Sequence, residues 1–324
     1  MQVSRSRPIT SQGPVSKAIL RKYQGSCESA ALIQCVTPRR QHDTFTRQSE
    51  NRHMKPCHLF IGGTARSGTS VLTKILSAHP DICVGLERYS NVLASREFTP
   101  QLFATTRFFD LRPNDTWYDS LDRFSEHYPR LRERYESARY RGDKIPVLPR
   151  RLAYVLANFP EVRVIITLRD IQAVACSYEA RADRGGDWGK SRRTAAAVED
   201  WNTMLAAVLR YVDDPRIHCV QYEDLFTSRE ALGAIFRFLK LDPVPAVDEK
   251  FERAQKHWRE KLSQRPPYVL TAEAQTLIAK HARTECYRHL IERLNGAPAP
   301  GLLTRVVSSL AGRFGRRSAD RITS

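Results

Sequence analysis

The chain contains the stretch His58-Leu-Phe-Ile-Gly-Gly-Thr-Ala-Arg-Ser-Gly-Thr-Ser-Val-Leu72, and its fold follows from this stretch. The apolar run Leu59 to Ile61 is typical of a buried strand, and a loop rich in Gly, Ser and Thr follows from Gly62 to Ser70. The next segment has the apolar spacing of an amphipathic helix and ends at His79-Pro80. A strand, a glycine loop and a helix N-terminus, in this order, form a cradle of backbone N–H groups that suits a phosphate.

The spacing of the loop resembles the ATP-binding P-loop, G-x-x-x-x-G-K-[ST], but its cation is displaced. Gly63, Gly68 and Ser70 match the pattern, whereas Thr69 stands where the lysine is expected and the cation is Arg66. The loop therefore predicts a phosphate site that is not arranged for the β- and γ-phosphates of ATP with magnesium. A glycine-rich turn without a ligand is the alternative.

The remaining apolar patterns alternate between strands and helices. A near-continuous apolar run predicts a strand at 162–168, and a further strand is predicted at 217–222. Apolar residues at helical spacing predict helices at 151–159, from 170 to about 181, and at 194–212, and a capping box at Thr227–Glu230 opens a further helix. Residues 97–143 are expected to be helical and irregular and to lie over the sheet. Together these elements predict an α/β fold of three layers, P-loop-like, with a central parallel sheet and helices on both faces.

The chain divides into a central domain and two basic tails. Residues 1–53 hold nine Lys and Arg against three Asp and Glu and lack apolar periodicity, which indicates a disordered segment, either a transit peptide or an upstream start. Residues 54–296 form the expected domain. Residues 297–324 read as a linker and a basic amphipathic tail. Within this tail, residues 302–317 have an apolar face that suits weak contact with a membrane surface, packing on the domain, or fraying.

The composition narrows the classes of protein. The net charge of +17 suits an anionic nucleotide or an acidic acceptor, and no recognised nucleic-acid-binding motif accompanies it. No apolar run is long enough for a membrane helix, and no secretory signal opens the chain, so a cytoplasmic location is expected. The seven cysteines are scattered without a C-x-x-C pair, which indicates free thiols in a reducing compartment.

A second candidate phosphate site follows the strand at 162–168. Arg169 ends this strand, where open α/β sheets bind ligands, and Ser177 and Arg181 lie on one face of the following helix. Two guanidinium groups and a hydroxyl suit a phosphate clamp. Two phosphate sites on two strand–helix turns fit a nucleotide that carries both a 5′ and a 3′ phosphate.

These motifs resemble the sulfotransferases that use 3′-phosphoadenosine 5′-phosphosulfate (PAPS), most closely the tyrosylprotein branch. The loop Arg66-Ser67-Gly68-Thr69-Ser70 is similar to the PRSGTT loop of that branch, and Arg169 and Ser177 match the R-x₇-S motif of the family. The resemblance implies that the loop binds the 5′-phosphosulfate and that Arg169, Ser177 and Arg181 bind the 3′ phosphate. Tyr222, in Tyr222-Glu-Asp-Leu225, corresponds to a tyrosine that contacts the nucleotide in the family.

The same resemblance implies the catalytic residues. Glu87 falls on the catalytic glutamate of the tyrosylprotein branch, and Lys144 falls on a lysine that helps to stabilise the reaction centre. With Arg66 they form the expected catalytic set, in which Glu87 takes the proton of the acceptor and no metal is required. The chain departs from the branch at Tyr89, where an arginine is usual, and at Val84 and Gly142, where two cysteines form a disulfide; a late serine of the branch is placed only loosely near Lys256-His257-Trp258.

The sequence therefore predicts transfer of a sulfuryl group from PAPS to a hydroxyl on a carbohydrate, lipid, peptide or small molecule. One alternative is a P-loop nucleotide kinase or ATPase, which the missing lysine and the 3′-phosphate clamp disfavour. A basic nucleic-acid-binding protein is the other alternative, and the concentration of charge in the tails disfavours it. The expected partners are a small nucleotide donor and a hydroxyl acceptor, without nucleic acid.

Overall fold

The structure is a computed structural model that describes residues 56–185, 188–264 and 268–296. The expectations for residues 1–53 and 297–324 therefore lie outside the described residues. Within the described part, five parallel strands form one sheet in the order β2-β3-β1-β4-β5. The strands are β1 (Cys57–Gly63), β2 (Ile82–Leu86), β3 (Tyr140–Lys144), β4 (Arg163–Leu168) and β5 (Ile217–Gln221). The predicted parallel sheet is confirmed.

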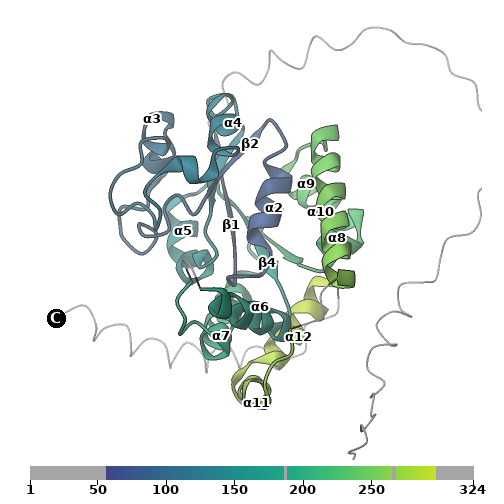
Figure 1. The fold of residues 1–324 in the computed structure, drawn as a ribbon. Coiled ribbons are helices and arrows are strands. Elements are labelled where there is room, and N and C mark those ends of the chain that lie inside the picture. Colours follow the sequence, from purple (N-terminus) through teal and green to yellow (C-terminus); the bar gives the residue numbers. More distant parts are fainter. Residues whose placement is uncertain (1–55, 186–187, 265–267, 297–324) are drawn as a thin grey trace, which may run out of the picture. The chain divides into compact units, whose positions relative to one another are not determined.

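Helices cover both faces of the sheet (Figure 1). The longer helices are α2 (Thr69–Leu76), α5 (Leu152–Asn158), α6 (Ile171–Arg184), α7 (Thr194–Tyr211), α9 (Arg229–Leu239), α10 (Pro245–Gln264), α11 (Ala272–His281) and α12 (Thr284–Leu294). Shorter turns of helix are η1 (Pro100–Phe103), α3 (Thr105–Phe108), η2 (Leu121–Phe124), α4 (Tyr128–Arg132), η3 (Leu148–Arg151) and α8 (Asp224–Thr227). The result is the P-loop-like α/β fold of three layers that the sequence predicts.

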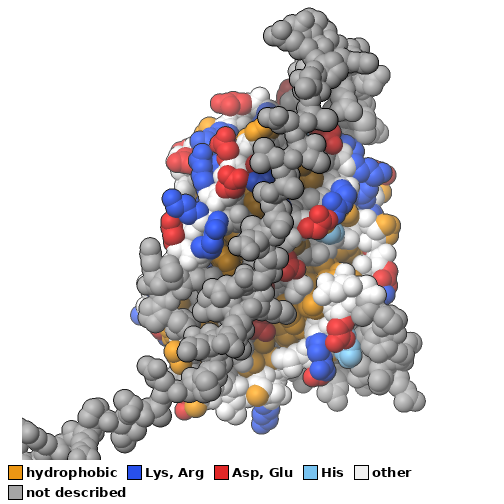
Figure 2. Space-filling model, turned by 90° about the vertical axis from the view of Figure 1, so that its right-hand side faces the viewer, with side chains coloured by type: hydrophobic (Ala, Val, Ile, Leu, Met, Phe, Trp, Pro, Cys, Tyr) orange, Lys and Arg blue, Asp and Glu red, His pale blue; other side chains and the backbone are white. Residues whose placement is uncertain are grey.

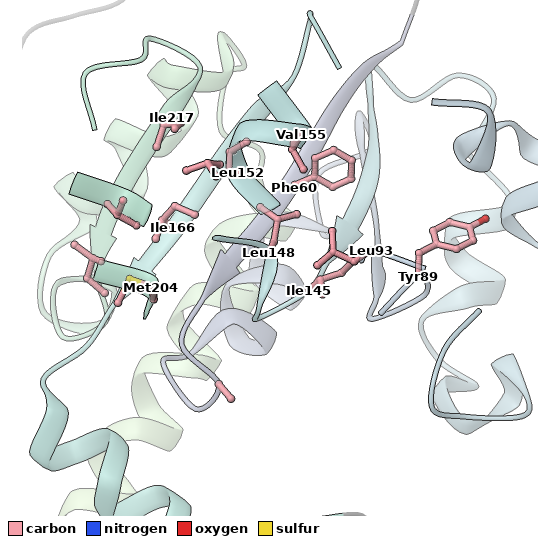
Figure 3. Packing of buried hydrophobic residues seen from close by; sticks show 14 of the residues in the cluster. Phe60, Tyr89, Leu93, Ile145, Leu148, Leu152, Val155, Ile166, Met204 and Ile217 are labelled. Carbon is pink, nitrogen blue, oxygen red and sulfur yellow. The ribbon is translucent and has the colours of Figure 1, made fainter. Parts of the chain in front are cut away.

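Alternating strand residues build one core on each face of the sheet. In β1, Leu59 and Ile61 pack with α2, α9 and α10, whereas Phe60 points to the opposite face. Figure 3 shows Phe60 close to Leu152 and Val155, which come from α5. Because both faces of the sheet are covered, β4 is almost completely buried, and this explains its near-continuous apolar run.

Two details of the predicted secondary structure are wrong. Residues 97–143 contain not only short helices and loops but also nearly all of β3, which lies between β1 and β2. The capping box is one residue out of place: Ser228, not Thr227, is the N-cap of α9, and its hydroxyl accepts the N–H of Glu230. Thr227 ends α8, and its hydroxyl donates to the carbonyl of Glu223.

A buried ion pair holds together the irregular segment between β2 and β3. The guanidinium of Arg88 is fully buried and donates to Asp115 at 2.7 Å and to the carbonyls of Phe108 and Asp110 at 2.8 and 2.7 Å. Asp115 also pairs with Arg107. Burial alone would raise the pKa of Asp115, but hydrogen bonds from Arg107 and Arg88 and from the backbone outweigh it and lower this pKa.

We predict that Asp115→Ala destabilises the protein by about 3–5 kcal/mol, because it leaves the buried charge of Arg88 without its carboxylate. The control is Asp110→Ala, which breaks the pair with Arg112 in the same segment, where both side chains are more than half exposed. That variant is expected to lose no more than about 1 kcal/mol. Urea unfolding at pH 7 measures both changes, and equal losses would contradict the assignment.

The lowered pKa of Asp115 also determines the pH range over which its carboxylate stabilises the folded protein. A carboxylate with a depressed pKa in the folded state stabilises the protein fully above its unfolded pKa of about 4. The stabilisation is lost as the pH falls through the lower folded pKa. The difference in stability between the wild type and Asp115→Asn is therefore expected to shrink in acid.

Candidate functional site

The candidate site lies at the carboxyl ends of the parallel strands. The chain order reverses at β1, which has β3 on one side and β4 on the other, and ligands of open α/β sheets bind at such a switch point. The loop after β1 leads into α2, and the turn after β4 leads into α6. The register pairs Gly63 at the end of β1 with Thr167 near the end of β4, so the two turns are neighbours.

Buried hydrogen bonds fix the loop after β1. The hydroxyl of Ser67 is fully buried and lies 2.6 Å from the carbonyl of Thr64 and 2.7 Å from the hydroxyl of Thr167 in β4. Arg66 has a φ of 69°, in the left-handed region that non-glycine residues seldom adopt. The loop thus presents Arg66 outward while Ser67 ties its inner side to the neighbouring strand.

Tyr222 explains the glycine at position 68. Gly68 has a φ of 92°, and a Cβ atom placed there would lie 2.3 Å from the ring of Tyr222. The guanidinium of Arg169 lies 4.1 Å from the centre of the same ring, in a cation–π contact. The tyrosine after β5 therefore packs against both turns of the candidate site, where the sequence analysis expects a contact with the nucleotide.

Direct hydrogen bonds join the two turns. Arg66 Nε donates to the hydroxyl of Ser177 at 3.1 Å, although the two residues are 111 positions apart. Arg169 Nη1 donates to the backbone carbonyl of Arg66 at 2.8 Å. The indole of Trp201, in α7, donates to the carbonyl of Arg169 at 2.9 Å and so links the turn after β4 to α7. The structure thus brings Arg66, Arg169 and Ser177 together.

Positive charge is concentrated around these contacts. Partial loss of hydration and then the charges of Arg181, Arg184 and Arg169 lower the pKa of Arg66, although the residue is solvent-exposed overall. Arg184 is absent from the residues that the sequence analysis selects. It lies seven residues after Ser177 and three after Arg181, so the helical face that contains these two residues could have revealed it. Four like charges near one another are an arrangement that suits a multiply charged anion.

An ion pair between Glu87 and Lys144 lies at the same edge of the sheet. Lys144 ends β3 with its side chain almost fully buried, and its Nζ lies 2.6 Å from Glu87 Oε1. The indole of Trp117 donates to the other oxygen, Glu87 Oε2, at 3.0 Å. Both carboxylate oxygens are therefore oriented. Trp117 lies in the irregular segment between β2 and β3, where no sequence pattern singles it out.

Hydrogen bonds also hold the turn that carries Glu87. Glu87 has a φ of 60°, its N–H donates to the carbonyl of Lys144 at 2.8 Å, and its carbonyl accepts the hydroxyl of Thr116 at 2.6 Å. The neighbouring Tyr89 is fully buried, and its hydroxyl donates to the carbonyl of Leu102 at 2.6 Å. Tyr89 is thus part of the core, and it cannot replace the arginine of the tyrosylprotein branch as a charged contact.

A groove of about 950 Å³ runs along α2, between residues 123–134 and α10. Leu86 and Tyr222 line it, and so does Arg123, whose guanidinium lies 4.5 Å from the centre of the Trp117 ring. On the side of the molecule that carries α8 to α10, apolar side chains are visible between groups of charged ones (Figure 2). His257 and Trp258 belong to α10 and also line the groove.

Several general expectations can be compared with the described residues. These residues include five free cysteines, Cys57, Cys83, Cys176, Cys219 and Cys286. Val84 and Gly142, at the positions of the family's paired cysteines, face each other on β2 and β3. Within the described part, no group of three or more His, Cys, Asp or Glu residues is arranged to hold a metal ion, and no helix is long and apolar enough to cross a membrane.

Comparison with known proteins gives consistent matches. A model of the sulfotransferase family matches residues 56–246, more than half of the chain. Protein-tyrosine sulfotransferase 1 of Danio rerio is 26% identical over 192 residues, which are 56% of this chain and 53% of that protein. The chain thus spans about half the length of this curated relative.

Solved structures with a similar fold are more distant. The sulfotransferase domain of the curacin biosynthetic pathway is 18% identical, with a TM-score of 0.42 over 80% of this chain and 99% of that domain. A mouse sulfotransferase in complex with PAP is 14% identical, with a TM-score of 0.39 over 82% of this chain and 86% of that protein.

We predict that Arg184→Gln stabilises the ligand-free protein by about 0.2–0.5 kcal/mol, because it removes one of the like charges near Arg66. The same change is expected to weaken the binding of inorganic pyrophosphate by about three- to tenfold, since a cationic contact of about 0.7–1.4 kcal/mol is lost. Arg210→Gln, at the far end of α7, is the control and is expected to leave binding unchanged. Urea unfolding and calorimetry measure the two effects. A variant that is no more stable and binds normally would exclude Arg184 from the anion site.

Proposed function

Because this chain belongs to the sulfotransferase family, we propose that it transfers a sulfuryl group from PAPS to a hydroxyl acceptor, and that residues 54–296 form the transferase domain. The observation that carries the proposal is the hydrogen bond from Arg66 to Ser177. This bond joins the loop expected to bind the 5′-phosphosulfate to the helix expected to bind the 3′ phosphate. A single nucleotide with both groups matches this pair of anion sites.

The residues present fit such a donor. Backbone N–H groups of the loop and the N-terminus of α2 suit the 5′ group; the residues concerned are Arg66, Ser67, Gly68, Thr69 and Ser70. Arg169, Ser177 and Arg181 suit the 3′ phosphate, with Arg184 as a further cation. The Nε of Arg169 has no hydrogen-bond partner among the described residues, and it lies 3.9 Å from Glu223 Oε1 in a long ion pair. The ring of Tyr222 lies beside Arg169 and Gly68 and therefore next to both proposed phosphate sites.

The proposed chemistry needs positioning and charge neutralisation. The donor supplies an activated sulfuryl group whose transfer to oxygen is an in-line displacement, analogous to phosphoryl transfer. Negative charge then develops on the phosphate that leaves. Arg66 and the loop N–H groups are positioned to neutralise this charge on one side, and the Lys144 ammonium does so from β3. In this scheme, the negative charge on the leaving phosphate is neutralised by cationic side chains and N–H groups of the protein.

Glu87 is the proposed general base. An acceptor hydroxyl must lose its proton as it attacks, and a positioned carboxylate accelerates such a step by about 10²–10⁴-fold. Lys144 and Trp117 each engage one oxygen of Glu87. A carboxylate has about four lone-pair sites, so these two contacts leave sites for the acceptor hydroxyl. Lys144 and Trp117 therefore orient the carboxylate of Glu87 and leave room for the acceptor hydroxyl.

The groove along α2 is the proposed route of the acceptor. Leu86, which precedes Glu87, lines the groove, and Arg123 connects its wall to Trp117 and hence to the carboxylate. The two alternatives gain no support: Thr69 still replaces the P-loop lysine of a kinase or ATPase, and no described feature favours a nucleic acid.

We predict that adenosine 3′,5′-bisphosphate raises the melting temperature and that AMP raises it much less, because AMP lacks the 3′ group. Ser177→Ala is expected to reduce this difference by removing a 3′ contact worth about 0.5–1.5 kcal/mol. Ser191→Ala, in the loop before α7, is the control. Thermal-shift titrations measure the effect. Equal stabilisation by the two nucleotides would exclude the proposed 3′ clamp.

We also predict that Glu87→Gln lowers turnover by about 10²-fold or more while the donor affinity stays nearly unchanged, since only the basicity is lost. Arg66→Ala is expected to weaken donor binding and turnover together, because it removes a cation from the leaving-group side. Calorimetry with adenosine 3′,5′-bisphosphate and a labelled-sulfate transfer assay separate the two effects. If Glu87→Gln turns over normally, the base is another residue, and the Lys256–His257 segment is the next to test.

A further inference from the structure

The backbone of the proposed base is held in an unfavourable conformation. Glu87 has a φ of 60°, in the left-handed region, where a residue with a Cβ atom is disfavoured by roughly 1–2 kcal/mol. Such a conformation persists only where surrounding contacts fix it. The contacts that fix Glu87 therefore determine where its carboxylate lies.

Many of these contacts come from the last two residues of β3. Lys144 accepts the N–H of Glu87 through its backbone carbonyl at 2.8 Å and pairs with the Glu87 carboxylate through its side chain at 2.6 Å. Asp143 Oδ2 accepts the N–H of Tyr89 at 2.9 Å. The N–H of Arg88 also interacts with this carboxylate and favours its charged form. Residues 143 and 144 thus contact Glu87 and the two residues that follow it.

Asp143 occupies the position of an anion in a backbone nest. Successive N–H groups that follow a left-handed residue converge into a concavity that binds anions. Here the residue is Glu87, the N–H groups belong to Arg88 and Tyr89, and the anion is the Asp143 carboxylate. Gly85 lies opposite Asp143 on β2 and leaves room for it, since a Cβ atom at Gly85 would lie 2.9 Å from Asp143 Oδ1.

The carboxyl of Asp143 is difficult to explain as a packing residue. It is fully buried, and its Oδ1 has no hydrogen-bond partner among the described residues. Burial raises its pKa to about 7, against the opposing effect of the Tyr89 and Arg88 N–H groups. An apolar residue of the same size would avoid this penalty. An apolar residue could not, however, accept the N–H of Tyr89, and the 87–89 turn would lose that hydrogen bond.

We infer that Asp143 is a positioning residue, whose buried carboxylate holds the 87–89 turn in its left-handed form and thereby aims Glu87 at the reaction centre. The inference rests on the proposed role of Glu87 as the base. The side chain of Asp143 is fully buried, so its effect on the reaction is exerted through the turn that carries Glu87. Displacement of a catalytic group by about 1 Å can lower turnover by about 10²-fold, so a small relaxation of the turn has a large effect.

The first test compares Asp143→Val with Asp143→Asn. Valine suits a strand and removes both the acceptor and the charge, whereas asparagine keeps an oxygen that can accept the Tyr89 N–H. We expect Asp143→Val to lower kcat by about 10²-fold with the donor Kd unchanged. Asp143→Asn is expected to restore most of this loss. Asp214→Asn, which alters a carboxylate paired with Arg216 at the opposite edge of the sheet, is the control and is expected to keep the wild-type kcat.

A double-mutant cycle asks whether Asp143 acts through Glu87. In the Glu87→Gln background, Asp143→Val is expected to cause no further loss of kcat, because the base is already absent. A further loss as large as in the wild type would overturn the inference. So would a wild-type kcat in Asp143→Val, or equal losses in the Val and Asn variants. If Asp143→Val does not fold, Asp143→Ala takes its place in the same comparisons.

A readout independent of catalysis separates this inference from the proposed function. The indole of Trp117 is bonded to the Glu87 carboxylate, so its environment reports the position of the base. With 5-fluorotryptophan in place of the four tryptophans, Trp117→Phe identifies the Trp117 resonance by fluorine NMR. We expect Asp143→Val to shift this resonance and Asp143→Asn to shift it much less. A wild type without sulfuryl transfer would refute the function alone, whereas an unmoved resonance in Asp143→Val would refute the positioning role.

Discussion

The site depends on the adjacency of β1 and β4 in the sheet. Because these strands are parallel neighbours, the turns that follow them lie side by side, and Arg169 can donate to the carbonyl of Arg66 across a separation of 103 residues. The hydrogen bond between the buried hydroxyls of Ser67 and Thr167 is a second link, between the loop after β1 and strand β4. These bonds oppose the repulsion among the arginines and hold Arg66 and Arg169 side by side, and charges that are already in place need little reorganisation to bind an anion.

A second constraint is the insertion of β3 between β1 and β2. Its last residues lie level with Ile61 and Leu86, so Lys144 reaches the turn after β2 while staying beside the glycine loop. The carboxylate of Glu87, the proposed base, is therefore oriented by a strand inside the sheet and not by a surface loop alone. Sites supported by strands are held more rigidly than sites on loops, and proton transfer requires that rigidity.

The donor half of the site was easier to predict from sequence than the acceptor half. The glycine loop and the spacing from Arg169 to Ser177 are local patterns, and each follows a strand with a clear apolar run. β3 was missed because Tyr140-Arg-Gly-Asp-Lys144 shows neither apolar alternation nor a continuous apolar run. Its glycine is required by tertiary structure: a Cβ atom at Gly142 would lie 1.8 Å from the carbonyl oxygen of Leu59. Asp143 and Trp117 likewise gain meaning only from contacts with a distant turn.

The residues proposed to bind the donor and those beside the proposed acceptor groove come from different segments of the chain. The residues proposed to contact the donor come from the loop after β1, from the turn after β4 and α6, and from the residue after β5, whereas Trp117 and Arg123 come from the long segment between β2 and β3. That segment is anchored by the buried Arg88–Asp115 pair and not by the donor site. Its outer residues can therefore differ without disturbing Arg66, Arg169 and Ser177. If the proposed function holds, donor binding and choice of acceptor depend on separate parts of the chain, which come together near Glu87 and Lys144.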